Sequence, residues 1–436
     1  MPNTVGYFGM RGSGDWNADE RPRNWREKIL QLFPNGDTPL TGILSKTKSQ
    51  TTDDPSFYWW EEPLAAQSGA LSGLYTDVAL STGYTTSDSL AVGATIYAKV
   101  PESVVNEVRI GHMVMLRYEG DTDRDKRAFV VNRAANGASS VLTLKMREAD
   151  SASASNLSTA NKIMVIGNSN AEGATMPDGV QYDPTKFTNV TQIFRTPLRL
   201  TGTAIETNLR TTNGYKHQKA KCLQYHGIEM EKALLYNGDA YEGVGTNGKP
   251  QRETAGLIKW IRDNAPDNVD NYVTTSDLST TTTWANGGKD WLDSKFEEIF
   301  KRGRGRKLGI CGTGALTGIN NLAQQYGSVQ LQPAAKAYGL EVREWITPFG
   351  KIDLMTHPLF SEVPGESNTI LIVEPENIIT RPLRNRDTRY KKDDRIDKGG
   401  AQGVDGIEEE YITELGWEFH HARTMGYLTG VGLPHP

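Results

Sequence analysis

The side chains best suited to catalysis in this sequence are its histidines, serines and carboxylates. No histidine pair has the His-Glu-x-x-His spacing of a zinc site, and no serine lies in a Gly-x-Ser-x-Gly turn. Asp353 and His357 would meet only on a helix, whereas the alternation around them predicts a strand. We therefore assign no catalytic residue, no metal ligand and no cofactor, and we expect a protein that is not an enzyme. The histidines are His112, His217, His226, His357, His420, His421 and His435.

Two motifs come close to known ligand sites but differ from them in detail. Asp121–Asp125 begins like a calcium loop, yet Lys126 stands where the sharp turn needs glycine, and Asn132 stands where a bidentate glutamate belongs. We interpret this segment as a solvated hairpin turn. Leu308–Gly318 is rich in glycine, but its spacing is that of neither a dinucleotide loop nor a phosphate loop. A strand-to-helix turn, with small residues for close packing, is the better explanation.

The run Lys301–Lys307 has the charge of a phosphate-binding patch. On a chain with a net charge of −5, such a run is more often a solvated loop or a contact between subunits. The net charge also argues against tight binding to a phosphate backbone, so only weak, non-specific contact with DNA is expected.

A longer run of alternating charge, Arg381–Gly400, is typical of a contact between copies of one chain. As isolated exposed ion pairs, these residues would contribute only about 0–1 kcal/mol each. Repeated around a symmetry axis, each copy would meet the opposite sign on its neighbour, and many weak pairs would fix the register. A mobile charged loop is the alternative interpretation. The candidate contact residues are Arg384, Arg386, Asp387, Arg389, Asp393, Asp394 and Arg395.

Four consecutive aromatic residues, Phe57–Trp60, form a second candidate contact. Alternate side chains of a strand point to opposite faces, so the four cannot all face one core. Either the strand is buried on both sides, or one aromatic face packs on a neighbouring subunit. In the second case Trp59 and Trp60 are the contact residues.

Composition bounds the class of protein. The chain has 436 residues, of which 37% are hydrophobic and 23% charged, so it is long enough for two or three domains with a substantial core. Its two cysteines are far apart in sequence, which predicts no structural disulfide and is typical of a protein made in a reducing cytoplasm. No stretch approaches the ~20 apolar residues that a membrane span needs.

Hydrophobic periodicity predicts a mixed α+β fold. Short alternating strands between residues 90 and 166 predict a small β-barrel or sandwich. Trp25–Phe33 predicts a short amphipathic helix, and Tyr215–Tyr236 predicts the strongest helix of the chain. Further helices are predicted at Trp291–Arg302 and Gly318–Tyr326. Strands are predicted at Glu341–Ile346, Ile352–His357 and Thr369–Val373.

The end of the chain is the most informative segment. Glu408–Phe419 alternates as a half-buried strand should, and a domain that ends on a long strand usually ties it into a sheet formed earlier. This segment resembles the closing strand of the tailed-phage major capsid protein, the Hong Kong 97 fold. Glu229–Gly238, followed by Thr254–Leu257, is similar to the spine helix and its exit in these proteins. Thr38–Leu40 and Trp60–Pro63 also resemble the arm region of one branch.

The resemblance implies an α+β subunit of the Hong Kong 97 type with an inserted β domain. It implies an N-terminal arm at 1–56, an extended loop at 57–89 and 167–205, and the inserted β domain at 90–166. It also implies a peripheral domain at 206–254 and 408–436 and an axial domain at 255–407.

The function implied is self-assembly of pentamers and hexamers into an icosahedral shell around double-stranded phage DNA. Assembly in the host cytoplasm is expected, with portal, scaffolding and cement or decoration proteins as partners and with no membrane. The alternatives are a phage tail or baseplate protein and a soluble α+β enzyme of unknown chemistry. A tail protein should form rings or trimers, and an enzyme should stay a small, discrete oligomer.

Overall fold

The computed structural model describes residues 47–62, 64–65, 67–207, 214–276, 282–326, 331–333, 342–392 and 406–434. The helix predicted at Trp25–Phe33 and most of the predicted arm lie outside these residues. The chain divides into two compact units. The first contains the described residues up to Trp59 and those from Lys186 onward, and the second contains Trp60–Thr185. The chain is a mixed α+β protein, as the sequence predicts.

A sheet built around the closing strand forms the base of the first unit. Strand β22 (Gly406–Phe419) pairs antiparallel with β11 (Gln192–Thr201) along the whole length of β11. Its other edge pairs with β20 (Ile378–Pro382) and β21 (Arg389–Lys392), and β1 (Lys48–Ser49) adds a parallel strand to β20. We call these five strands the long sheet. The last long strand therefore joins a sheet begun earlier in the chain, which confirms that prediction.

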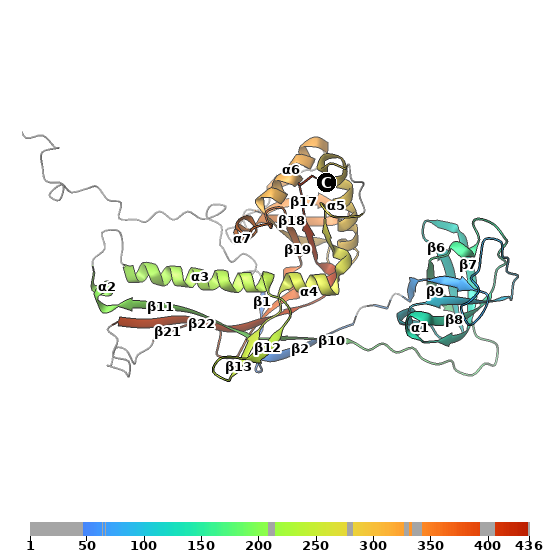
Figure 1. Ribbon diagram of the computed structural model, residues 1–436, viewed down its shortest axis with the longest axis horizontal. Helices are drawn as coiled ribbons and strands as arrows, with labels where there is room; N and C mark the ends of the chain where they lie inside the picture. The colour runs from blue at the N-terminus through green and yellow to red at the C-terminus, as the bar shows by residue number, and fades with distance from the viewer. Residues whose placement is uncertain are drawn as a thin grey trace, which may run out of the picture. The chain divides into compact units, whose positions relative to one another are not determined.

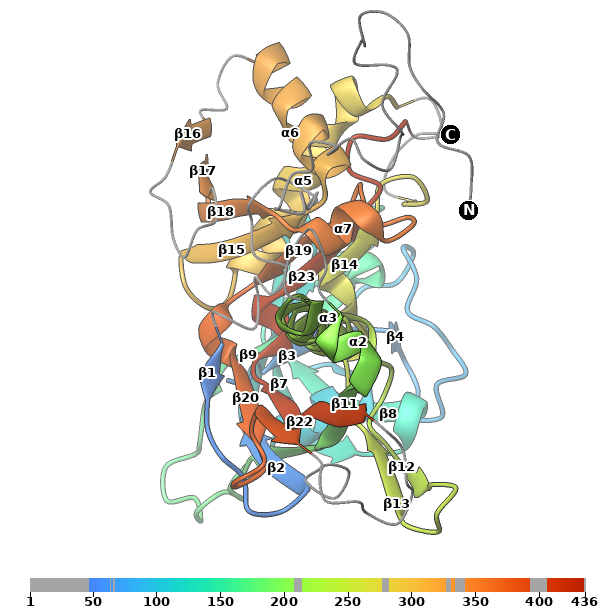
Figure 2. The same ribbon diagram turned by 90° about the vertical axis from the view of Figure 1, so that its left-hand side faces the viewer.

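The predicted long helix lies along one face of the long sheet (Figure 1). It is α3, Gly214–Tyr236, and Figure 2 shows it end-on above β11 and β22. Near its C-terminus, Met230 and Leu234 join Trp417 and Phe419 of β22 in one hydrophobic cluster. Burial of large apolar side chains is the main stabilising term in a fold, so this end of α3 anchors the helix on the sheet.

A second sheet, of seven strands in the order β14-β23-β19-β15-β18-β17-β16, carries the rest of the first unit. Its strand β19 is buried on both sides. Ile370 and Ile372 pack with helices α5 and α6, whereas Leu371 and Val373 join the cluster that includes α4 and Phe360 of α7. The strands are β14 (Val269–Asn271), β15 (Arg306–Cys311), β16 (Leu331–Pro333), β17 (Val342–Thr347), β18 (Gly350–Thr356), β19 (Ile370–Val373) and β23 (Gly426–Thr429). The helices are α4 (Leu257–Asn264), α5 (Trp284–Phe300), α6 (Thr313–Tyr326) and α7 (Pro358–Glu362).

Helices α5 and α6 begin earlier than the sequence predicts. α5 begins at Trp284 rather than Trp291, and α6 begins at Thr313 rather than Gly318. Glycines in both early turns lower helix propensity, which hides the true start. Tertiary packing offsets that cost, because a Cβ at Gly318 would lie 2.6 Å from Cα of Gly432. The glycine allows the C-terminal segment to pass against the helix.

The glycine-rich stretch Leu308–Gly318 is a strand-to-helix turn, as predicted. β15 ends at Cys311 and α6 begins two residues later. A Cβ at Gly312 would lie 2.3 Å from the backbone oxygen of Ser367, so only glycine fits this close approach. Both cysteines of the chain are free and buried.

Three smaller elements lie mostly in the first unit, since β2 and β10 each cross the boundary between the two units by one or two residues. β2 (Ser56–Glu61) pairs with β10 (Thr185–Val190) in a two-stranded ribbon, and β12 (Tyr241–Val244) pairs with β13 (Pro250–Glu253) in a hairpin. The short helix α2 (Gly202–Glu206) follows β11.

The second unit is an antiparallel sheet of seven strands, in the order β3-β9-β6-β7-β8-β5-β4. Its two edge strands are joined by only two residues, Leu71 and Ser72. The amide of Leu71 donates to the carbonyl oxygen of Asn161, and the amide of Ser72 donates to that of Lys99, each at 2.8 Å. The sheet therefore closes on itself as a barrel. Its elements are β3 (Ser68–Ala70), β4 (Gly73–Tyr75), β5 (Thr95–Val100), α1 (Glu102–Glu107), β6 (His112–Tyr118), β7 (Asp121–Ala134), β8 (Ser140–Met146) and β9 (Lys162–Asn168).

Two sequence expectations are corrected in this unit. Strands β3 and β4 precede residue 90, so the barrel begins earlier than the predicted boundary of 90–166. The segment Asp121–Asp125 is not a turn, because β7 begins at its first residue and the turn is formed by Glu119 and Gly120.

Candidate subunit interface

The face of the long sheet opposite α3 carries a regular pattern of charge. On β11, Phe194 and Leu198 are buried toward α3, while Arg195 and Arg199 point the other way and are 62% and 74% exposed. This alternation follows from the period of two in a strand. The register places Pro197 opposite Glu410, so the glutamates of β22 form a column beside the arginines of β11.

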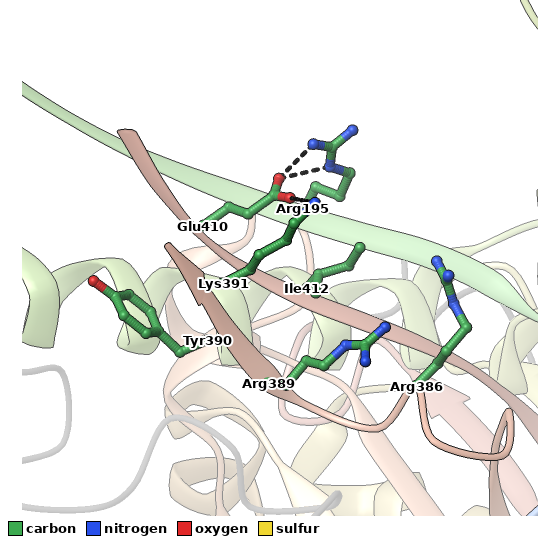
Figure 3. Close-up of a pocket in the computed structure, with 7 residues that line it drawn as sticks. All are labelled: Arg195, Arg386, Arg389, Tyr390, Lys391, Glu410 and Ile412. Carbon is green, nitrogen blue, oxygen red and sulfur yellow. Dashed lines mark hydrogen bonds and ion pairs between the residues drawn. The ribbon is translucent and has the colours of Figure 1, made fainter. Parts of the chain in front are cut away.

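A second cationic column borders the glutamates on the other edge of β22. The register places Lys391 of β21 opposite Glu410 and Arg389 opposite Ile412. Glu410 receives an ion pair from each side, with Arg195 at 2.5 Å and with Lys391 at 3.9 Å (Figure 3). The central acidic strand therefore lies between two basic ones.

The two columns enclose a shallow depression of about 490 Å³ with an excess of positive charge. Four cations line it and one carboxylate does. Within the part of the chain that the structure describes, Arg389 has no ion pair, and Arg386 pairs with the buried Glu414. An exposed concave surface with unbalanced charge favours a partner of opposite charge. Its lining is Arg195, Arg386, Arg389, Tyr390, Lys391, Glu410 and Ile412.

Only some of the contact residues predicted between Arg381 and Gly400 lie at this depression. Arg386 and Arg389 line the depression. Arg384 lies outside it in an exposed ion pair of 2.9 Å with Asp53, and the carboxylate of the exposed Asp387 accepts from the amide of Thr388. The remaining three predicted residues, Asp393, Asp394 and Arg395, lie outside the described residues.

The aromatic strand β2 is neither buried on both sides nor in contact with a neighbouring subunit through both tryptophans. Trp59 is 7% exposed and stacks on Phe57 and Phe187 of its own unit, with ring centroids 6.4 and 5.8 Å apart. Trp60 is 62% exposed and Tyr58 54%. One aromatic face is thus core and the other is surface, so Trp59 is corrected to a core residue. Trp60 remains a candidate contact.

The sequence reasoning missed the β11 half of this surface. Arg195 and Arg199 are separated by four residues in a strand, so they share a face, and that spacing was the available signal. Their position beside Glu410 and Glu408 depends on strand pairing and register, which a single sequence does not specify.

The basic run Lys301–Lys307 is neutralised within its own unit. Lys301 and Arg302 pair with Glu298, Arg304 pairs with Glu376, and Arg306 pairs with Asp353. Lys307 is buried against Glu374. A run whose cations already have acidic partners is a poor phosphate-binding patch. Asp353 lies on strand β18, as predicted, and its ion-pair partner is Arg306. It does not meet His357, which pairs with Glu231 instead.

Buried polar side chains join α3 to the face of the long sheet on which it packs, opposite the charged face. The ring of His226 is fully buried, with Nδ1 2.9 Å from Oγ1 of Thr196 and Nε2 2.7 Å from Oγ1 of Thr413. Burial lowers the pKa of His226, because the charged ring is poorly solvated there, and Glu229 opposes this only in part. At the start of the helix, burial and the hydrogen bond to Glu409 raise the pKa of Tyr215 to about 12.

We expect His226 to make the unassembled subunit sensitive to acid. Its folded pKa lies below the unfolded value of 6.5, so the unfolded chain binds more protons once the pH falls below about 6.5. The free energy of unfolding should therefore fall with pH in that window. Urea unfolding at several pH values should show a shallower fall for His226→Gln. His217→Gln, on a partly exposed position of the same helix, is the control and should keep the wild-type slope.

The described residues contain no group of three or more histidine, cysteine or acidic side chains arranged to hold a metal ion. No described helix is long and apolar enough to cross a membrane.

Comparisons with known proteins identify the class. A family model described as SU10 major capsid protein matches residues 7–432. The major capsid protein of Pseudomonas phage PaMx41 is 24% identical over 405 residues, which covers 91% of this chain and 88% of that protein. The chain belongs to the SU10 major capsid protein family and is a shell-forming capsid protein. This confirms the prediction of a major capsid protein, which has a structural role in the phage virion.

Solved structures give weaker likenesses. A chain of Mycobacterium phage Bobi has a TM-score of 0.45 at 8% identity and covers 94% of this chain and 96% of its own length. The capsid of Myoviridae phage XM1 has a TM-score of 0.42 at 9% identity, with 96% and 100% covered.

Proposed function

We propose that copies of this chain assemble as pentamers and hexamers into an icosahedral shell around double-stranded phage DNA, with a subunit of the Hong Kong 97 type. The observation that carries the proposal is the exposed, net positive face formed by β11, β22 and β21. Its charges alternate by column, so it offers a defined register to a neighbouring copy. Arg386 and Arg389 are the residues of the predicted set that contribute to it.

The domain roles follow the same resemblance. We assign α3 and the long sheet to the peripheral domain, and the seven-stranded sheet with α5 and α6 to the axial domain. The barrel of the second unit is the inserted β domain, carried on the extended loop. The exposed face of Trp60 and Tyr58 is a second contact for a neighbouring copy, because exposed aromatic residues are enriched where proteins meet.

Other partners are those that a phage shell requires. A portal, a scaffolding protein and cement or decoration proteins would meet the assembled shell, and assembly would occur in the host cytoplasm. Contact with packaged DNA would be weak and non-specific, because the chain has a net charge of −5 and the run Lys301–Lys307 is internally paired.

Electron microscopy of the expressed protein after size-exclusion chromatography tests the proposal. We expect closed shells, or pentamers and hexamers, from the chain alone or together with its scaffolding protein. Large shared interfaces supply the free energy of such assemblies. A stable monomer or a small symmetric oligomer under all of these conditions would contradict the proposal.

A further inference from the structure

One stretch of the sequence is free of charge to an unusual extent. Residues 308–335 include no Asp, Glu, Lys, Arg or His over 28 positions. At the chain average of 23% charged residues, 28 positions would hold about six. The next longest stretch without these residues, 63–76, has 14 positions. The proposed function does not account for this feature.

Burial explains only the beginning of the stretch. Leu308–Cys311 belongs to β15, which lies in the middle of the seven-stranded sheet, and a central buried strand excludes charge. The helix α6 that follows is not buried on all sides. Ala315, Ile319 and Leu322 face the core, but the opposite side is exposed. The exposed residues are Thr313, Thr317, Asn321, Gln324 and Gln325, and we call them the α6 stripe.

Helix α5 provides an internal comparison. It packs on the same hydrophobic cluster as α6, so both helices belong to one layer of the fold. Its outer side carries the usual charges of a solvated helix, including Lys289, Asp290, Asp293 and Glu297. Two helices in one layer with equal access to water should both carry charge on their outer faces. The α6 stripe differs, and depletion of charge is characteristic of the core of a protein interface.

The residue types of the stripe suit contact with themselves. Asn, Gln and Thr each carry a hydrogen-bond donor and an acceptor, so each can bond an identical residue. Lys, Arg, Asp and Glu cannot, because two identical charges placed side by side repel each other. Around a rotation axis, residues near the axis lie close to their own copies. Such a position selects for uncharged, self-complementary side chains.

We propose that the α6 stripe meets the α6 stripes of neighbouring copies around a rotation axis of the shell, an inference that rests on the proposed function and names one of its contact surfaces. The partner is a second copy of this chain. The contact is polar and uncharged, in contrast to the charged face of the long sheet.

Charge substitutions of either sign at Gln324 test this contact. If stripes meet, Gln324→Glu and Gln324→Lys each place like charges together in every ring. Both should reduce the yield of shells by at least about tenfold, which corresponds to about 1.4 kcal/mol. The same two substitutions at Ser294, exposed on α5, should leave the yield unchanged and serve as matched controls. Unfolding of the unassembled variants should match that of the wild type.

Mixing the two variants identifies the partner. Co-expression of the Gln324→Glu and Gln324→Lys chains should restore shells, because opposite charges then meet. Loss of assembly without such rescue would show that α6 contacts a different surface and would overturn the proposal. Normal yields from both variants would overturn it as well. A wild-type chain that forms no shells would instead contradict the proposed function.

Cross-linking gives an independent measurement on assembled shells. Cys222 and Cys311 are buried, so the wild-type chain should form no inter-subunit disulfide on oxidation. Gln324→Cys shells should yield covalent dimers. Their absence, with shells intact, would also overturn the proposal.

Discussion

Reversing Arg195 and Arg389 to glutamate should leave a folded subunit that forms no shells. Arg195 makes an exposed ion pair with Glu410, and such a pair contributes only about 0–1 kcal/mol to folding. Arg389 is exposed and has no ion pair among the described residues. The double substitution lowers the charge of the face by four units. An acidic surface of a neighbouring copy would then be repelled, at a cost of several kcal/mol per contact.

The effect is large because the contact repeats in every copy. Size-exclusion chromatography and electron microscopy measure the yield of shells, and urea unfolding of the unassembled chain measures folding. The control is Arg127→Glu with Lys162→Glu. This pair of substitutions changes the charge equally at two exposed ion pairs of the barrel, with Glu148 and Glu119. Shells of normal yield from the Arg195 and Arg389 variant would contradict the assignment of this face as an interface.

Elements with strong periodicity were predictable from the sequence. The long helix and the closing strand lie within a few residues of their predicted positions, and strands β5 to β9 fall within or close to the region 90–166 that was predicted to be rich in strands. The start of β7 is the exception, because it lies in the segment interpreted as a turn. Each has a hydrophobic repeat that local geometry alone explains. The starts of α5 and α6 were not predictable, because glycines near the beginning of each helix lower its helix propensity. In α6 these glycines serve packing against segments far away in sequence, since Gly314 lies against Ser367 and Gly318 lies against Gly432.

The charged surfaces required the structure. In a half-buried alternating strand, Glu414 and Glu418 should lie on the face opposite Leu415 and Trp417, away from the core, yet both are about 5% exposed or less. They are tolerated because Arg386 and Arg381 pair with them. Likewise, nothing in the run Lys301–Lys307 distinguishes the buried lysine from its exposed neighbours. Pairing between distant segments determines which of these charged side chains are buried, and that pairing depends on strand register rather than on local sequence.

Two neighbouring cations of the run Lys301–Lys307 should respond to the same substitution with effects of very different size. Lys307→Met should lower the free energy of unfolding by about 3–5 kcal/mol, whereas Arg306→Met should change it by about 0–1 kcal/mol. The side chain of Lys307 is fully buried, and its Nζ lies 2.6 Å from Oε1 of Glu374, which is 8% exposed. Removing the ammonium group leaves a buried carboxylate without its cation. The side chain of Arg306 is 63% exposed, so in the Arg306→Met variant water can take the place of the guanidinium group beside Asp353.

Other hydrogen bonds of Glu374 and Lys307 determine where in the range of about 3–5 kcal/mol the loss of stability in Lys307→Met should fall. Oε1 of Glu374 also accepts from the amide of Arg304 at 2.9 Å, and Oε2 accepts from Nδ2 of Asn377 at 3.0 Å. These donors remain in the variant. The ammonium of Lys307 also donates to the carbonyl oxygen of Thr424 at 2.8 Å, and that acceptor is left without it. The two effects oppose each other, so we expect a loss near the middle of the range. Urea unfolding of the unassembled subunit measures it.

A double substitution separates loss of the pair from loss of packing. Lys307→Met together with Glu374→Gln removes both charges, so no uncompensated carboxylate remains in the core. Because a neutral pair of similar volume can replace a buried ion pair at little cost, the double variant should recover most of the stability lost by Lys307→Met alone. If the double variant were less stable than either single one, the loss would come from packing and from the Thr424 hydrogen bond. The buried charge would then not be its cause.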